Sequence, residues 1–77
     1  MPHQPPPGWV LTRQRAIGVQ LREARRQAGL TQIQLGEGIG RDHKTISRWE
    51  NAVRTPDLRD LLLLADALGV PLADLVR

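Results

Sequence analysis

Residues 41–50, RDHKTISRWE, contain the residue types of two different kinds of chemistry. Asp42, His43 and Ser47 are the types of a hydrolytic triad, and His43 and Ser47 have the spacing of neighbours on one helical face. Consecutive residues of a helix diverge by about 100°, however, so Asp42 would point away from His43. The sequence also offers no loop for an oxyanion hole, and GEGIG ends a predicted helix instead of joining a strand to a helix, as a phosphate-cradling loop does. We therefore expect no enzymatic activity.

The second kind of chemistry is nucleic-acid binding by an amphipathic helix over about 42–51. At about 100° per residue, Ile46 and Trp49 fall on one side and predict a core-facing stripe. The opposite side carries donors long enough to reach base edges or phosphates, namely Lys44, Ser47, Arg48 and Asn51, with His43 at its margin. The alternative for these side chains is an ordinary solvated face. The alternative for Trp49 is a stacking platform for single strands, and the core is favoured for it.

The preceding residues predict a short helix and a tight turn that would position this face. Thr31 and Gln34 have the spacing of a capping box. Gly40 suits the turn because it tolerates positive φ, and Asp42 suits the cap of the next helix. A close crossing of the two helices is expected at Gly36. This order of cap, short helix, turn and second short helix is typical of a helix-turn-helix.

Three further helices are expected around this pair. Apolar residues recur at helical spacing over 13–28, with Thr12 as the expected N-cap and Gly29 as the stop. Pro56 marks a loop before a leucine-rich helix over 58–68, and residues 71–76 predict a short last helix. The leucine-rich helix is apolar over most of its circumference, so it should lie deep in the core or share a face with a partner. The fold class is all-α with five helices.

The composition limits the domain organisation and the kinds of site. The chain has 77 residues, 40% of them apolar, which is enough for one compact core. We expect a flexible proline-rich arm over 1–11, with residues 9–11 tucked against a domain over 12–77. With no Cys, and with His3 far from His43, neither a metal site nor a cofactor is expected. No apolar run could span a membrane and no signal peptide is recognisable, so a cytoplasmic protein is expected.

Basic residues are concentrated in the first two thirds of the chain. Residues 1–30 carry five Arg and one Glu, residues 31–54 carry four basic and three acidic residues, and residues 55–77 carry two Arg and four Asp. This asymmetry is consistent with a polyanion-binding face, the alternative being ordinary solubilising charge.

The motifs GLTQ and TISRWE, followed by the leucine-rich segment that ends in ADALGV, resemble the Cro and phage-repressor type of helix-turn-helix domain. This type is also called the xenobiotic-response-element family, and the likeness runs from about Ile17 to Val76. The resemblance implies a five-helix domain that binds double-stranded DNA, usually as a homodimer on a palindromic operator, with the second and third helices as the reading pair.

The resemblance also implies roles for individual residues. Gln32 would contact a phosphate and support the reading side chains, and a structural ion pair would join Arg25 to Glu50. The remaining expected contacts are His43, Lys44 and Arg48 to base edges, Thr45 and Ser47 to base or phosphate, and Asn51 and Arg54 to the backbone beyond the helix.

The sequence departs from the family pattern at several positions. Arg41 replaces a small apolar residue, so it either contacts a phosphate or drapes its stem over Ile39. Ala52 stands where the family often has Gly, which would strain a positive φ unless Asn51 takes that conformation. Asp42 replaces a hydroxyl cap and brings a negative charge near DNA.

The sequence as a whole predicts a sequence-specific DNA-binding regulator, with a dimeric repressor as the expected form. Arg48 is the first candidate for bidentate pairing with guanine, and Lys44 the second. The alternative is a protein-interaction module, such as an antitoxin or adaptor, that binds a partner through the last two helices.

Overall fold

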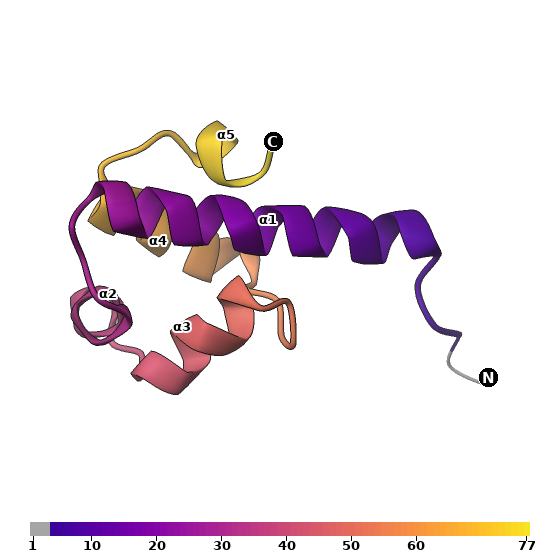
Figure 1. The fold of residues 1–77 in the computed structure, drawn as a ribbon, viewed down its shortest axis with the longest axis horizontal. Coiled ribbons are helices and arrows are strands. Elements are labelled where there is room, and N and C mark those ends of the chain that lie inside the picture. The colour runs from indigo at the N-terminus through magenta and orange to yellow at the C-terminus, as the bar shows by residue number, and fades with distance from the viewer. Residues whose placement is uncertain (1–3) are drawn as a thin grey trace.

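The computed structural model describes residues 4–77, which form five helices and no strand. They are α1 (Gly8–Gln27), α2 (Gln32–Ile39), α3 (His43–Glu50), α4 (Leu58–Leu68) and α5 (Leu72–Leu75). Figure 1 shows α1 as a long rod with α2 and α3 on one side and α5 on the other. The predicted all-α fold of five helices is confirmed, although α5 is shorter than expected.

The first helix begins earlier than the sequence pattern indicated. Its N-cap is Pro7, and the Thr12 hydroxyl donates to the carbonyl of Gly8 at 3.1 Å, so the prediction of Thr12 as the N-cap was wrong. No residue between Pro7 and Thr12 interrupts a helix. The helix can therefore extend back to Pro7, the last residue of the proline cluster, where helical hydrogen bonding begins. Residues 8–11 are therefore the first turn of α1, and residues 4–7 have no regular secondary structure. The predicted arm is otherwise untested, because residues 1–3, including His3, lie outside the described part of the chain.

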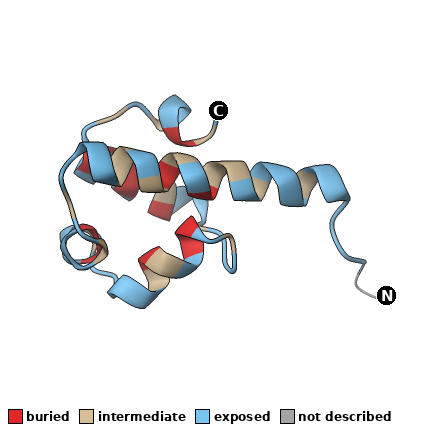
Figure 2. Cartoon of the chain, viewed as in Figure 1, coloured by how far each residue is buried: buried red, intermediate tan, exposed pale blue. Residues whose placement is uncertain are grey.

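The first turn of α1 also does not tuck against the domain. Trp9 is 71% exposed and Leu11 is 39% exposed. In Figure 2 the N-terminal half of α1 carries mostly exposed residues and projects beyond the other helices.

The boundaries of α2, α3 and α4 and the end of α1 follow from local signals, as predicted. Thr31 forms a capping box with Gln34, and the Asp42 carboxylate accepts a hydrogen bond from the Thr45 amide at 2.8 Å. Gly29, Gly40 and Gly69 have positive φ and follow the ends of α1, α2 and α4. Asp57 and Asp60 form a second capping box at the start of α4.

The core lies where α1, α2, α3, α4 and α5 meet. Its most deeply buried side chains are Leu21, Leu35, Ile46, Leu64 and Leu75. The leucine-rich helix α4 divides its leucines between the core and the surface, since Leu58 is 64% and Leu62 is 52% exposed. The helix α4 is therefore part of the core, as predicted, and it also leaves an apolar surface uncovered.

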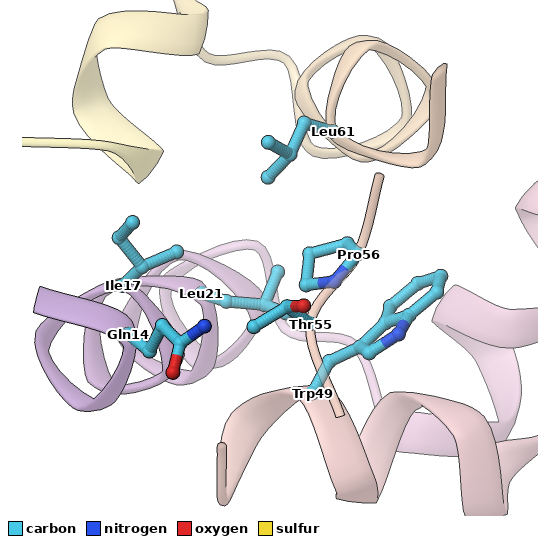
Figure 3. Close-up of a pocket in the computed structure, with 7 residues that line it drawn as sticks. All are labelled: Gln14, Ile17, Leu21, Trp49, Thr55, Pro56 and Leu61. Carbon is cyan, nitrogen blue, oxygen red and sulfur yellow. The ribbon is translucent and has the colours of Figure 1, made fainter. Parts of the chain in front are cut away.

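Beside the core lies a small apolar hollow with a volume of about 60 Å³ (Figure 3). Ile17 and Leu21 of α1, Trp49 of α3, Pro56 of the following loop and Leu61 of α4 line it, together with Gln14 and Thr55. Ligand pockets usually have volumes of about 300 Å³ or more, so this hollow is a packing feature and not a small-molecule site. In the part of the chain that the structure describes, no helix has the length and apolar character needed to cross a membrane.

Candidate nucleic-acid interface

The turn between α2 and α3 is tight because two glycines remove steric obstacles. The Arg41 amide donates to the Gly36 carbonyl at 2.8 Å, and Gly40 has a φ of 74°. A Cβ atom on Gly36 would lie 2.4 Å from the Arg41 carbonyl oxygen, closer than any real contact. A close crossing of α2 and α3 was expected at Gly36, but the backbone that Gly36 approaches is that of the turn between them. This contact fixes the direction in which α3 leaves α2.

The predicted division of α3 into an inner and an outer face is also confirmed. Ile46 is completely buried and Trp49 is 5% exposed, so Trp49 is a core residue. On the other side His43, Lys44 and Arg48 are exposed, and their side chains form no hydrogen bond or ion pair with residues 4–77. Their charged or polar ends are therefore available to a partner.

Asp42 and Thr45 use their polar groups within the protein. One Asp42 carboxylate oxygen accepts from both the Thr45 amide at 2.8 Å and the Thr45 hydroxyl at 3.0 Å. These hydrogen bonds, the backbone one first, hold the pKa of Asp42 below its ordinary value. The carboxylate is thus a helix cap, and it is not paired with His43 as a hydrolytic triad would require.

Arg41 has a different partner from either of those proposed from the sequence. Its guanidinium donates to the Asp60 carboxylate at 2.8 Å and lies 5.9 Å from the centre of the Trp49 ring. Burial raises the pKa of Asp60, but the Arg41 hydrogen bond and charge and the bonds within the capping box outweigh it, and the pKa of Asp60 is lowered. Arg41 therefore links the α2–α3 turn to α4.

Glu50 is the buried centre of a network that joins α1, α2 and α3. Its side chain is completely inaccessible, and Arg25 donates to it through Nε at 2.6 Å and through Nη2 at 3.0 Å. Arg22 Nε and Gln32 Nε2 each donate to it at 3.3 Å. Burial would raise the pKa of Glu50, but these hydrogen bonds and the charge of Arg25 outweigh it and leave the pKa lowered. The predicted Arg25–Glu50 pair is confirmed, and Gln32 belongs to the same network.

Asn51, at the end of α3, is held by two neighbours. Its Oδ1 accepts from Arg22 Nη2 at 2.7 Å, and its Nδ2 donates to the Ser47 carbonyl at 2.9 Å. Arg54, by contrast, is exposed and has no side-chain hydrogen bond to another described residue. Sequence reasoning missed Arg22. The only available signal was its position three residues before Arg25, on the same face of the helix.

The connection after α3 contains the strained residue that the sequence pointed to. Ala52 has a φ of 57°, and it is the single non-glycine residue of the described chain with positive φ. Asn51 has a φ of −95° and does not take that role.

The surface of α3 therefore presents cations and donors on a rigid support. Burial of Ile46 and Trp49, the α2–α3 turn and the Glu50 network fix the helix, and Lys44 and Arg48 project from it. Within residues 4–77, no cluster of three or more His, Cys, Asp or Glu side chains is arranged to hold a metal ion.

Comparison with known proteins gave matches of the same architecture. A helix-turn-helix family model matches residues 21–75. The restriction-modification controller protein C.AhdI from Aeromonas hydrophila has a similar structure, with 31% identity, a TM-score of 0.81, and coverage of 84% of this chain and 94% of that one. The P22 c2 repressor, solved in complex with synthetic operator 9T, shares 30% identity with a TM-score of 0.74, covering 79% of this chain and 92% of that one.

A third structure, the hypothetical transcription factor NHTF from Neisseria, is 26% identical with a TM-score of 0.78, and the match covers 100% of this chain and 86% of that one. A comparison with curated protein sequences gave no match. The family model covers more than half of the 77 residues, and two of the structures share at least 30% identity over most of the chain. The chain therefore belongs to the Cro and phage-repressor type of helix-turn-helix family and is a DNA-binding transcriptional regulator.

Proposed function

We propose that this regulator binds a specific double-stranded DNA sequence by placing α3 in the major groove. The observation that carries the proposal is the outer face of α3, where Lys44 and Arg48 are exposed and unpaired within residues 4–77 while Ile46 and Trp49 anchor the opposite side. A major groove about 12 Å wide admits one α-helix, and Arg or Lys can pair with guanine O6 and N7. Arg48 is the first candidate for this pairing and Lys44 the second.

The supporting contacts come from residues around this helix. His43 and Ser47 lie beside the reading side chains, and Arg54 is free to contact a phosphate. Gln32, Thr45 and Asn51 act mainly through other residues, because their polar groups already hold Glu50, Asp42 and Ser47. We therefore assign Gln32 and Asn51 to positioning the end of α3, with phosphate contact as a second role.

The regulator is proposed to act as a repressor in the form of a homodimer on a palindromic operator, without a cofactor or a catalytic step. The operator complex named for the P22 c2 repressor supports this assignment by similarity. The exposed leucines of α4, Leu58 and Leu62, supply apolar surface for a second copy. In such a dimer the two α3 helices should lie about 34 Å apart, in successive turns of the major groove.

The experiment is selection of bound duplexes from a random-sequence DNA pool, followed by affinity measurements on variants. Arg48→Ala should weaken binding by about 1–3 kcal/mol and relax the preference at one base position, whereas Arg54→Ala should weaken all sequences alike. If Arg48→Ala changes neither affinity nor preference, α3 does not read the sequence as proposed.

The second candidate function is a protein-interaction module, and the exposed α4 leucines favour it. Salt dependence separates the two. A DNA reader that neutralises several phosphates loses affinity steeply with salt, with a slope of about −0.9 per phosphate. Absent or salt-independent DNA binding would favour a protein partner on α4 and α5.

A further inference from the structure

The middle of α1 lies directly against the C-terminal end of α3. A Cβ atom on Gly18 would lie 2.5 Å from the Glu50 carbonyl oxygen and 2.9 Å from that of Trp49, so the two backbones touch there. In Figure 1 the C-terminal end of α3 is directed at the middle of α1. Residues three or four positions apart share one face of a helix. Arg15 and Arg22 therefore flank the contact at Gly18, one on each side.

These two arginines line a shallow hollow beside the end of α3. Its volume is about 210 Å³, and it is lined by Arg15, Val19, Arg22, Glu50, Asn51 and Ala52. Glu50 is the one acidic residue among them, and its side chain is completely buried. The accessible charge of the hollow is therefore positive.

This positive charge exceeds what the internal ion pairs neutralise. Arg22 and Arg25 share the single carboxylate of Glu50. Arg15 is exposed and forms no hydrogen bond or ion pair with any residue from 4 to 77. Two guanidinium groups thus share one carboxylate while the charge of Arg15 is left without an ion pair among residues 4–77, and an anion entering the hollow would balance the excess.

The hollow is continuous with the outer face of α3. Asn51 joins them, because it bonds Arg22 on one side and the Ser47 carbonyl on the other. The eight residues of α3 make a helix about 12 Å long, comparable to the width of the major groove. Groups that flank the end of a helix in the groove lie beside the phosphates of the groove wall.

We propose that Arg15 and Arg22 of α1 form a binding site for a phosphodiester of the DNA bound by α3. The site rests on the proposed function and extends the DNA contact from the helix-turn-helix onto the first helix. Arg22 is held in place by Glu50 and Asn51, and Arg15 supplies the uncommitted charge. The site contributes affinity without reading a base, because phosphate contacts carry no sequence information directly.

Arg15→Gln in the full chain tests this proposal, with Arg13→Gln as the matched control. Both variants remove one charge from α1. Arg13, however, donates to the Val76 carbonyl at 2.9 Å, on the α5 side of α1 away from α3 (Figure 1). The ligand is a duplex selected from a random pool by the unaltered protein, and its dissociation constant is measured by fluorescence anisotropy from low salt to near 1 M. Urea unfolding checks that both variants fold.

Each protomer of the homodimer makes one such contact, so Arg15→Gln should reduce the steepness of the salt dependence by about 0.9 per protomer, or about 1.8 for the dimer. Dimer binding should weaken roughly 30-fold at 0.15 M salt, while the selected sequence stays the same. Arg13→Gln should do neither. A duplex with a neutral methylphosphonate in place of the contacted phosphate should bind the unaltered protein more weakly. The same replacement should not further reduce the affinity of the Arg15→Gln variant.

Equal effects of the two variants would overturn the site on α1 while leaving the proposed function intact. A failure of the unaltered protein to select any duplex sequence would instead overturn the proposed function, and the site with it.

Discussion

Glu50 is the side chain whose replacement should reveal most about how the recognition helix is held. Glu50→Gln keeps the size of the side chain but removes its charge and turns one acceptor into a donor. In the native protein the two carboxylate oxygens accept four hydrogen bonds, two from Arg25 and one each from Arg22 and Gln32. The amide can accept at one oxygen only, and its NH₂ group would face a guanidinium.

The expected loss of stability is about 3 kcal/mol. Removing one partner of a buried ion pair typically costs about 3–5 kcal/mol. The lower end applies here, because the Arg25 and Arg22 side chains are 11% and 31% exposed and can recover some hydration. A chain of this size has a total unfolding free energy of about 4–12 kcal/mol, so the variant should retain about 1–9 kcal/mol. The melting temperature should fall by roughly 12–24 °C.

The loss of stability caused by Glu50→Gln should become smaller as the pH falls. The pKa of Glu50 in the folded protein is below its ordinary value of about 4.3. The stabilisation of the folded state by ionised Glu50 is therefore fully present above that ordinary pKa. It is lost as the pH falls through the lower pKa of the folded state. The stability difference between the native protein and Glu50→Gln should shrink accordingly in acid.

Urea unfolding at neutral and acidic pH measures both quantities, with Glu37→Gln as the control. Glu37 is exposed on α2 and has no ion pair with the other described residues, so its replacement should change stability by less than about 0.5 kcal/mol. If Glu50→Gln and the control unfold at the same urea concentration at neutral pH, the network does not stabilise the end of α3.

Two substitutions, each with a control substitution, test the backbone around α3. Gly36→Ala should destabilise the protein by about 1–3 kcal/mol, because its Cβ would meet the Arg41 carbonyl, and should also weaken DNA binding. Gly38→Ala, with only the Ala67 Cβ at 4.0 Å, should stabilise α2 by up to about 1 kcal/mol, and equal urea midpoints would contradict the steric argument. Ala52→Gly should raise stability by about 0.5–1 kcal/mol, since its φ of 57° suits glycine. Ala67→Gly, in the helix α4, should lose about 1 kcal/mol, and a loss at Ala52 as well would rule out strain there.

Much of the fold could be predicted from residues close together in the sequence. The caps at Thr31, Asp42 and Asp57 and the stop at Gly40 are local devices, whose donors and acceptors lie within a few residues of one another. The start of α1, which was predicted wrongly, shows the limit of such signals. A residue that can cap a helix, such as Thr12, does not do so where the helix continues without interruption to a proline.

The buried and exposed faces of α3 could also be predicted from the sequence, because helical periodicity alone places Ile46 and Trp49 opposite Lys44 and Arg48. Tertiary structure decided which polar side chains remain free for a partner. Arg41 is committed to Asp60, and Arg22 to Glu50 and Asn51, across 19, 28 and 29 residues of chain. No local spacing rule brings such groups together, since their meeting depends on how the helices pack. Helix packing thus joined Arg41 to Asp60 and brought Arg15 and Arg22 of α1 to the end of α3.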